Sequence, residues 1–342
     1  MKDLLVAGGG PAGLATALYA ARAGLDVEIW EPRVGAIDKA CGEGLMPAAL
    51  AALRDLGVDP HGHDLTGIRY VSGGRRAEAT FAAGVGRGVR RVTLHRALLD
   101  AVEAAGVRVV QRRAADVRQD DSRVDVGGNR FRYLVAADGL HSPIRRALGL
   151  DMQARGPVRF GLRTHFEMAP WSAFVEVHWT AGCEAYITPI TANRVGIAIL
   201  TSDKGPYVDH LARVPAVAER VEGADHDRIV GAGPLRQRSR SRVAGRVLLV
   251  GDASGYVDAL TGEGIALGIS QARVAVQALC AERPRDYERS WRLASWRYQA
   301  LTAGLVGATQ IGVVRKVIVP AAQRAPWVFG AAVNALAGPV LV

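Results

Sequence analysis

Residues 3–31 read DLLVAGGGPAGLATALYAARAGLDVEIWE, in which an apolar run leads directly into the three glycines of Gly8-x-Gly10-x-x-Gly13. The Ala- and Leu-rich segment 12–23 has a helical pattern and stops at Gly24. A second apolar run then ends at Glu31. The sequence therefore predicts a strand, a tight turn, a helix and a second strand that closes on an acid.

This arrangement favours a dinucleotide-binding unit over a purely structural glycine turn. The first glycine makes the tight turn, the second lets the backbone approach a pyrophosphate, and the third lets the helix pack on the strand. The helix N-terminus offers free N–H groups to the same anion. Glu31, 23 positions after Gly8, stands where a carboxylate accepts hydrogen bonds from ribose hydroxyls. The residues predicted to bind the cofactor at this turn are Gly8, Gly10, Pro11, Ala12 and Gly13.

The composition is that of a globular protein large enough for two domains. The chain has 342 residues, of which 49% are hydrophobic and 22% charged, and its formal net charge is +10. Aromatic residues make up only 6%, so the charge lacks the aromatic side chains typical of a nucleic-acid interface. We expect the charge to attract a phosphate-bearing cofactor or an anionic membrane surface, and we predict no nucleic-acid partner.

The three cysteines indicate neither disulfides nor a metal site. Cys41, Cys183 and Cys280 lack paired spacing and the spacing of metal ligands. No basic and apolar leader precedes the first expected strand, which begins at residue 3. We therefore expect a cytoplasmic protein without a bound metal.

A polar, glycine-rich loop follows Glu31. It begins with Pro32-Arg33 and reaches Cys41-Gly42-Glu43 before a helix expected over 47–56. A loop in this place would run back along an extended cofactor toward its reactive end, which makes Cys41 and Glu43 candidates for the chemistry. The alternative is that the glycines only make a turn and that the Cys41 thiol packs in the interior.

The next segments of the nucleotide-binding domain lead to a buried strand with an acid behind it. Residues 114–117 are expected to form an edge strand, whose Val117 could cover an adenine with its backbone, and a polar hairpin is expected over 119–130. The buried strand that follows ends in Asp138-Gly139. Ser142, directly before Pro143, is expected to cap the next helix.

Residues 68–89 and 155–242 change character, because apolar residues alternate there as they do in half-buried strands. We expect these segments to form one antiparallel sheet, a substrate-binding domain inserted into the nucleotide-binding domain. The predicted fold class is α/β. The predicted nucleotide-binding domain is discontinuous, over 1–67, 90–154 and 243–284, and a helical region is expected over 285–342.

A second glycine-rich turn closes the nucleotide-binding domain. The buried strand after Gly245 ends in Gly251-Asp252, and Gly262-Glu263-Gly264 then opens a long helix at Ile265. A helix start of this kind carries partial positive charge and free N–H groups, so it can stabilise an anion. An ordinary capped helix is the alternative.

The chain after Pro284 is expected to be helical and becomes increasingly apolar. Residues 326–342 are interrupted only by Asn334 and fall short of a membrane span. This segment is expected to pack on the substrate domain, or else to rest on a bilayer surface beside Arg315, Lys316 and Arg324. Peripheral membrane contact through this region is therefore a second expectation for where the protein lies.

Four motifs together resemble the flavoprotein superfamily that holds the single-component FAD aromatic hydroxylases and the geranylgeranyl reductases. The motifs are Gly8-Gly-Gly-Pro-Ala-Gly13, Arg91-x-x-Leu94-His95, Ala137-Asp138-Gly139 and Gly251-Asp252-Ala253. The resemblance spans residues 3 to 282 and implies a Rossmann-like FAD-binding domain of the glutathione-reductase type.

The resemblance also implies how FAD would lie. Its adenosine would bind at Glu31, where Pro32 and Arg33 complete the predicted set, and its pyrophosphate on the first helix. Arg91 would contact the phosphate or ribityl region, and Asp252 the ribityl or pyrophosphate oxygens. Asp138-Gly139 is associated with FAD and with transient NADH or NADPH. The residues of the late helix start, expected to stabilise the negative N1–C2 edge of a reduced flavin, are Gly262, Glu263, Gly264 and Ile265.

Local departures separate the branches of this superfamily. Ser254-Gly255 and Ala259 stand where hydroxylases usually keep Ala-His and Pro, and the Cys41-Gly42 segment is similar to the reductases' Cys-Gly loop. Against the reductases, the segment around Tyr186 lacks the Trp of their Tyr-x-Trp-x-Phe-Pro pattern. The sequence contains no Trp-x-Trp-x-Ile-Pro segment, so a halogenase is not expected.

Two enzymatic hypotheses follow, of which we favour the first. In the first, NAD(P)H reduces FAD, and a flavin C4a-hydroperoxide hydroxylates a hydrophobic aromatic, polyketide- or quinone-like molecule of the kind found in secondary metabolism. Glu43, Tyr186 and His178 are its candidate side chains. In the second, reduced FAD delivers a hydride to an isoprenoid double bond, and Cys41 or a water gives the proton. A non-catalytic flavin-binding protein is the third alternative.

Overall fold

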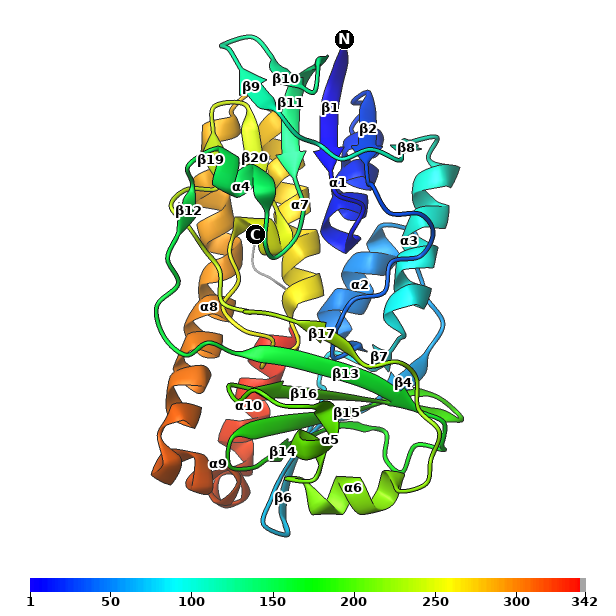
Figure 1. Ribbon diagram of the computed structural model, residues 1–342, viewed down its shortest axis with the longest axis vertical. Coiled ribbons are helices and arrows are strands. Elements are labelled where there is room, and N and C mark those ends of the chain that lie inside the picture. The colour runs from blue at the N-terminus through cyan, green and yellow to red at the C-terminus, as the bar shows by residue number, and fades with distance from the viewer. Residues whose placement is uncertain (339–342) are drawn as a thin grey trace.

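An eight-stranded sheet forms around β1 in the upper half of the molecule as Figure 1 shows it. The computed structural model describes residues 1–338, with Gln310 and Arg315 by their backbone alone. The strand order is β19-β20-β11-β1-β2-β8, and the neighbouring strands from β20 to β8 are parallel. Two further strands lie off this path, since β10 pairs with β11 and β9 pairs with β10. The strands are β1 (Lys2–Ala7), β2 (Val27–Trp30), β8 (Arg108–Val110), β9 (Val117–Gln119), β10 (Val124–Val126), β11 (Asn129–Ala136), β19 (Val243–Ala244) and β20 (Val247–Leu249).

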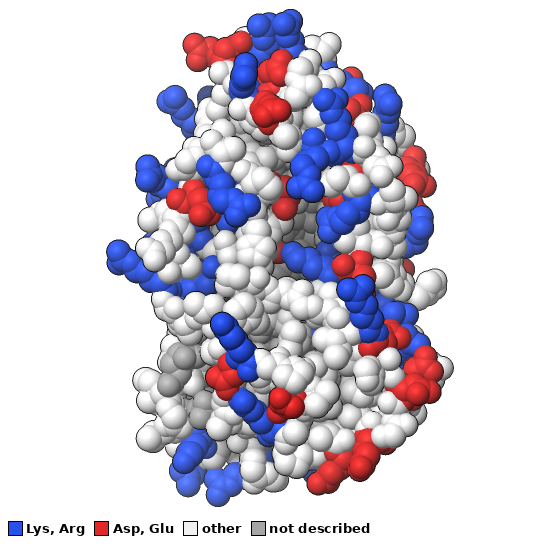
Figure 2. All heavy atoms as spheres, in the orientation of Figure 1, with Lys and Arg blue, Asp and Glu red and all other residues white. Residues whose placement is uncertain are grey.

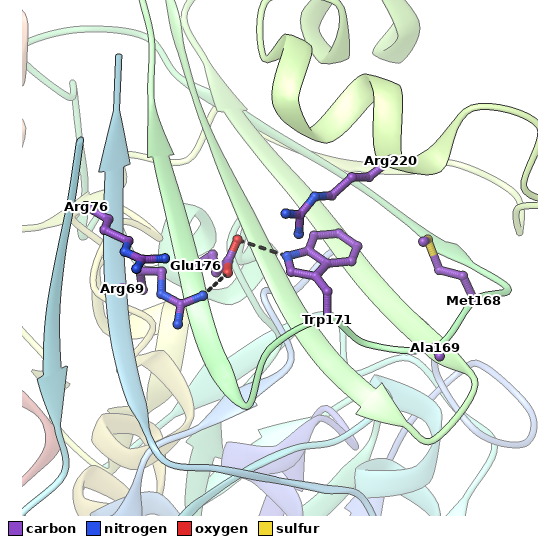
Figure 3. A pocket seen from close by; sticks show the side chains of 7 residues that line it. All are labelled: Arg69, Arg76, Met168, Ala169, Trp171, Glu176 and Arg220. Carbon is purple, nitrogen blue, oxygen red and sulfur yellow. Dashed lines mark hydrogen bonds and ion pairs between the residues drawn. The ribbon is translucent and has the colours of Figure 1, made fainter. Parts of the chain in front are cut away.

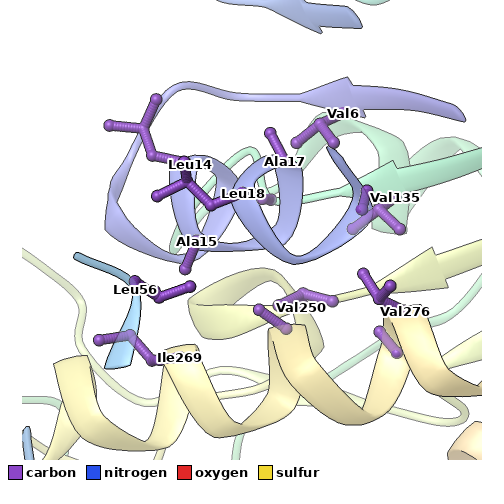
Figure 4. Close-up of a cluster of buried hydrophobic side chains, with 14 of the residues drawn as sticks. Val6, Leu14, Ala15, Ala17, Leu18, Leu56, Val135, Val250, Ile269 and Val276 are labelled. Atoms are coloured by element: carbon purple, nitrogen blue, oxygen red, sulfur yellow. The ribbon is translucent and has the colours of Figure 1, made fainter. Parts of the chain in front are cut away.

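Both faces of this sheet are buried, as is usual for parallel strands. Leu4 and Val6 of β1 join one buried cluster, and Leu5 and Ala7 join the cluster on the other side. The helices α1 (Pro11–Arg22) and α7 (Gly264–Cys280) belong to the first cluster, and Figure 4 shows buried side chains gathered between them. The strand, helix and second strand expected within residues 3–31 are confirmed.

A second sheet, of seven strands, fills the lower half of Figure 1 in the order β17-β13-β16-β15-β14-β5-β6. Its strands are β5 (Gly67–Ser72), β6 (Arg75–Thr80), β13 (Phe160–Phe166), β14 (Phe174–Trp179), β15 (Cys183–Thr191), β16 (Arg194–Thr201) and β17 (Val230–Ala232). Neighbouring strands are antiparallel except β14 and β5. The expectation of a wholly antiparallel sheet is wrong at that pair, because no hairpin joins two strands so distant in the chain.

The second sheet also contains less of the chain than expected. β7 (Gly86–Gly88) leaves it and pairs with β3 (Gly44–Leu45) and β4 (His63–Leu65) in a small sheet, and β12 (Asp151–Met152) pairs with β18 (Arg238–Ser239). The other helices before α8 are α2 (Pro47–Asp55), α3 (Arg91–Ala104), α4 (Pro143–Ala147), α5 (Tyr207–Leu211), α6 (Pro215–Val221) and the 3-10 turns η1 (Gly251–Ser254) and η2 (Pro284–Asp286).

Two local expectations between the sheets have different outcomes. The strand expected over 114–117 begins only at Val117, because Asp116 has a left-handed φ of +52° that interrupts the extended backbone. β9, β10 and β11 then form an antiparallel meander where a single hairpin was expected. The cap predicted at Ser142 is confirmed, since its Oγ accepts a hydrogen bond of 2.9 Å from the Arg145 N–H.

Three helices follow η2. α8 (Tyr287–Gln310) runs along the left side of both halves in Figure 1, and α9 (Gly312–Arg324) and α10 (Pro326–Ala337) pack on β6. Val319, Phe329 and Val333 are buried in the same cluster as Val175 of the lower sheet. Packing of the tail on this sheet is therefore confirmed up to residue 338, and residues 339–342 lie outside the described residues. Between residues 1 and 338, the helices are all too short or too polar to cross a membrane.

Side-chain hydrogen bonds fasten α10 to the edge strand β6. Asn334 accepts a hydrogen bond of 2.7 Å from the Ala82 N–H and donates one of 3.1 Å to the Thr80 carbonyl. We expect Asn334→Ala to lower the free energy of unfolding by about 1–3 kcal/mol, because both bonds are lost. Gln323→Ala, which removes a single bond of 2.8 Å to the Arg76 carbonyl, should lower it by less. Urea unfolding of the three proteins measures the difference, and equal stability would contradict this role of Asn334.

Candidate active site

The predicted cofactor residues lie in a row along one edge of the upper sheet. The parallel strands β20, β11, β1 and β2 are neighbours, and they are followed in that order by Asp252, Asp138, Gly8 and Glu31. Ligands of open α/β sheets bind outside this carboxyl edge. Figure 2 shows a hollow near the middle of one face, between the two halves, with Lys and Arg side chains on its rim. The arrangement suits an extended, negatively charged ligand.

The first glycine turn has the close contacts that its pattern predicts. A Cβ on Gly8 would lie 2.4 Å from the Ala137 carbonyl oxygen, and one on Gly13 would lie 1.9 Å from the Gly8 carbonyl oxygen. Gly10 differs, because a Cβ there would meet no heavy atom within 4 Å. Pro11 and Ala12 begin α1 directly after this open position. The N-terminus of α1 therefore faces free space beside the row of strand ends.

Glu31 is buried at the end of β2, and its carboxylate is fully engaged. Its oxygens accept hydrogen bonds from the Gly9 N–H at 2.8 Å and from the Arg33 guanidinium at 2.8 and 3.0 Å. Burial alone would raise the pKa of Glu31, but these hydrogen bonds lower it below its usual value. Arg33, which follows Pro32, is exposed. A ribose at Glu31 would therefore replace Arg33 as the partner of the carboxylate.

The loop after Glu31 runs back along the row, as the sequence predicts. Lys39 Nζ lies 3.1 Å from the Asp252 carboxylate, which is in η1 after β20. A Cβ on Gly139 would lie 3.9 Å from the same Nζ. Asp38 forms an ion pair with the buried Arg163 of β13. The loop thus crosses from the β2 end of the row to the β20 end and is anchored on both sheets.

Asp138 and Gly139 occupy the middle of the row. Asp138 Oδ2 accepts a hydrogen bond of 3.1 Å from the Ile144 N–H at the start of α4, and burial raises the pKa of the carboxyl. Gly139 has a left-handed φ of +87°. Behind them, the buried Arg145 donates to the Ala253 carbonyl at 3.0 Å and so ties α4 to η1. The two strand ends are held in a fixed relation.

Cys41, Arg91 and Tyr256 form a polar group beside Asp252. The buried guanidinium of Arg91 interacts electrostatically with Cys41 and Asp252, while Tyr256 interacts with both of the same residues. Burial raises the pKa of the Cys41 thiol, so the thiol is protonated at neutral pH. The sequence did not single out Tyr256, although it stands only four positions after Asp252. A Cβ on Gly264 would lie 3.6 Å from its ring.

Glu43 is an anchor of the Cys41 loop. Its backbone has a left-handed φ of +59°, and its buried carboxylate accepts from the Arg91 N–H at 2.7 Å and lies 2.6 Å from His165 Nε2. His165 Nδ1 in turn lies 3.0 Å from Asp227. Since both carboxylate oxygens are occupied, the geometry favours a positioning role for Glu43. No sequence motif pointed to His165, because its partner Glu43 lies 122 positions away.

The late glycine turn lies at the β20 end of the row. Gly262 and Gly264 flank Glu263 at the start of α7, and Ile265 follows in its first turn. A Cβ on Gly268, in the second turn of α7, would lie 3.2 Å from the Ala12 Cβ, so the N-terminal parts of α1 and α7 are close together. Glu263 is buried beside Leu267, Arg297 and Tyr298, and burial raises its pKa to about 8.

The buried Glu263 predicts a specific pH dependence of stability. Its pKa is about 8 in the folded chain and about 4.3 when unfolded, so the unfolded state loses its proton first and stability falls as pH rises between these values. In the FAD-free protein, Glu263→Gln and the wild type should have the same free energy of unfolding near pH 4. Between that pH and pH 8, the variant should become the more stable protein, by up to about 1.4 kcal/mol for each pH unit. Urea unfolding across this range measures the effect. Glu103→Gln, at an exposed position, should leave the dependence of the unfolding free energy on pH unchanged. If the curve for Glu263→Gln ran parallel to that of the wild type, the raised pKa of Glu263 would be contradicted.

Tyr186 faces the late glycine turn from the lower sheet. It lies on β15, and its hydroxyl donates a hydrogen bond of 2.9 Å to the Leu260 carbonyl. Burial raises the pKa of the Tyr186 hydroxyl well above its usual value, so it stays protonated. Tyr186 therefore joins the lower sheet to the segment that precedes α7. Its contact with a substrate stays a prediction.

His178 lies on the opposite face of the same sheet and does not join the other candidates. Val177 is the partner of Tyr186 in the β14–β15 pair, and side chains alternate, so His178 points away. It lies 3.2 Å from Glu176, which lines the outer groove of Figure 3 with Trp171 and Arg69. Burial would raise the pKa of Glu176, but hydrogen bonds from these three residues lower it to about 2. This placement is a correction to the catalytic role expected for His178.

Val117 has its backbone engaged in the meander, where it pairs with Val126 of β10. Its expected contact with an adenine stays a prediction.

Two buried polar atoms around the row, Asp138 Oδ1 and Arg91 Nε, have no partner among the described residues. Buried polar groups are normally satisfied, so these atoms fit a polar ligand that completes them. The open N-terminus of α1, the acid after β2 and the basic rim fit the pyrophosphate and ribose of a dinucleotide. Fold and cleft together define an α/β protein with a dinucleotide-binding site at the carboxyl edge of its parallel sheet.

Comparison with known proteins names the family. The chain belongs to the family described as FAD binding domain, whose model matches residues 1–296. Menaquinone reductase of Mycobacterium tuberculosis is 30% identical over 327 residues, covering 84% of this chain and 78% of that protein. Digeranylgeranylglycerophospholipid reductase 1 of Methanothermobacter thermautotrophicus is 28% identical, covering 85% and 82%. The solved structure of the flavin-dependent brominase Bmp2 has a TM-score of 0.82 at 17% identity, covering 100% and 94%, and it shows the fold alone.

Proposed function

We propose that the protein is an FAD-dependent reductase that saturates a carbon–carbon double bond in the isoprenoid chain of a lipid, such as a prenylated quinone. The two relatives above are named as reductases of menaquinone and of digeranylgeranylglycerophospholipids. The proposal reverses the order of the two hypotheses drawn from the sequence alone. The observation that carries it is the position of Cys41, in the loop that Lys39 anchors to Asp252, where its thiol interacts with the buried guanidinium of Arg91.

Cys41 has the properties of a proton donor. Saturation adds a hydride to one carbon and a proton to its neighbour, and bound FAD would supply the hydride. Burial keeps the proton on Cys41 Sγ until the substrate takes it. The Arg91 guanidinium then favours the thiolate that remains, because it lowers the pKa of that thiol. A proton from solvent restores the thiol.

The surroundings of the reactive end suit an apolar substrate. Met46 lies between the two glycine segments, since its Cε is 3.3 Å from a Cβ placed on Gly44 and 3.8 Å from one on Gly262. Leu65 and Leu260 are buried in the same cluster. Apolar walls exclude water and strengthen the electrostatic effect of Arg91. NADH or NADPH is proposed as the reductant, which dithionite can replace in a test.

Product mass in the presence and absence of oxygen tests the proposal. FAD-loaded protein, reduced with dithionite, is mixed with menaquinone and analysed by mass spectrometry. We expect an isoprenoid chain heavier by two hydrogen atoms per turnover, formed without oxygen and retained after the quinone headgroup has been reoxidised in air. A product heavier by one oxygen atom, formed only in air, would support hydroxylation instead. An unchanged substrate, with a geranylgeranyl lipid also unchanged, would support a non-catalytic flavoprotein.

A further inference from the structure

The outer side of the last two helices exposes an unusual number of large apolar side chains. Val313 of α9 is 75% exposed and Trp327 of α10 is 78% exposed. We name the C-terminal outer face after its exposed apolar members, which are Ile311, Val313, Val317, Trp327 and Val328. Val313 and Val317 are one helical turn apart and therefore share a side of α9. Exposed apolar side chains gathered on two neighbouring helices are typical of an interaction site.

α9 and α10 are apolar on the buried side as well. Val319 and Ala322 of α9, and Phe329 and Val333 of α10, face the lower sheet. A helix that packs on one side of a protein normally carries polar residues on the other. Apolar residues on both sides indicate that a second apolar surface covers the outer face.

The charge of this region points to an anionic surface. After Glu288 the sequence contains no Asp or Glu as far as residue 342. The same segment contains six basic residues, which are Arg289, Arg292, Arg297, Arg315, Lys316 and Arg324. Lys316 and Arg324 are exposed on α9, next to the apolar residues. Arg292 pairs with Glu288 at 3.4 Å, whereas Lys316 and Arg324 form no ion pair with any of the described residues.

We propose that the C-terminal outer face docks on the surface of an anionic lipid bilayer. Exposed Val and Trp side chains would enter the boundary between headgroups and acyl chains, where Trp is favoured, while Lys316 and Arg324 contact the headgroups. α9 and the start of α10 lie on the surface in this arrangement and do not cross it. The proposal stands without the reductase assignment, although docking would bring the cleft to lipid substrates.

Flotation of the full, FAD-loaded chain with vesicles tests the proposal. We expect binding to vesicles of phosphatidylcholine mixed with phosphatidylglycerol, weaker binding to phosphatidylcholine alone, and release by high salt. The double variant V313S/W327S should bind at least about tenfold more weakly. Charge reversal by K316E/R324E should weaken binding roughly fivefold per residue at low salt. The matched control V158S/V208S changes two valines that are 58% and 62% exposed elsewhere, and it should bind as the wild type does.

Three results would overturn docking on a bilayer. They are failure to float with either vesicle, equal loss of binding in the V158S/V208S control, and unchanged binding of V313S/W327S. Light scattering provides a fourth test: if the wild type is a dimer that V313S/W327S converts to a monomer without any effect on flotation, the face is a contact between two copies of this chain. Flavin absorbance of each variant verifies folding.

Discussion

Gly10→Val is expected to give a folded but colourless protein. A side chain at Gly10 meets no protein atom within 4 Å, and its φ of −74° suits any residue, so the FAD-free fold should be unchanged. The new side chain would fill the space at the N-terminus of α1, where the pyrophosphate is expected. Loss of several charge-assisted hydrogen bonds of about 1.5–3 kcal/mol each should weaken FAD binding by at least about 1,000-fold.

Fluorescence titration with FAD measures this affinity, and thermal unfolding of the FAD-free proteins verifies the fold. Gly304→Ala is the matched control, because it also adds a side chain in open space, on α8. It should bind FAD as the wild type does. Normal FAD binding by Gly10→Val would contradict the position assigned to the cofactor. Gly13→Ala is different, since its Cβ would lie 1.9 Å from the Gly8 carbonyl oxygen and should destabilise the fold itself.

Cys41→Ala is expected to lower the rate of double-bond reduction by roughly 100- to 10,000-fold, the usual contribution of a positioned general acid. FAD content should be unchanged, because the Cys41 side chain accepts only one long contact of 3.4 Å from the Glu43 N–H. In the wild type, the rate should decline only at alkaline pH, above the raised pKa of the thiol. Single-turnover kinetics with reduced, FAD-loaded protein measure the step.

Cys280→Ala is the matched control for that experiment, because Cys280 is a free thiol exposed at the end of α7. It should retain the full rate. Loss of flavin from Cys41→Ala would show that the Cys41 loop has a structural role, which is the alternative in which the thiol only packs in the interior. A full rate with normal flavin content would assign the proton to water or to another group.

The sequence predicts best what depends on neighbours in the chain. Gly8, Gly13 and Glu31 follow from one local pattern, and the structure places Gly8 and Glu31 after β1 and β2 at one edge of the sheet and Gly13 in the first turn of α1. The same reasoning failed for His178, since a shift of one residue along a strand reverses the side of the sheet. Glu43 and His165 illustrate a second limit. Their contact joins segments 122 residues apart, which no local pattern encodes.

The register and direction of the strands in the lower sheet also depend on contacts between distant segments, which local sequence patterns do not encode. Alternation of apolar residues predicts that 68–89 and 155–242 contain strands, but it does not state which strands pair. The parallel pairing of β5 with β14 depends on the crossing of the chain between the two sheets. Cys41 and Tyr256 meet for the same reason, because the loop after β2 and the segment after β20 converge at one end of the cleft.

The most direct test of the account is the reoxidation of reduced flavin without oxygen. The FAD-loaded protein is reduced with one equivalent of dithionite under argon and mixed with menaquinone or a geranylgeranyl lipid, and flavin absorbance is followed while the lipid is analysed. The account predicts that the yellow colour returns under argon, at a rate that depends on the lipid and is lost in Cys41→Ala, with one double bond saturated per flavin. Flavin that stays reduced with every isoprenoid lipid until air is admitted would contradict it.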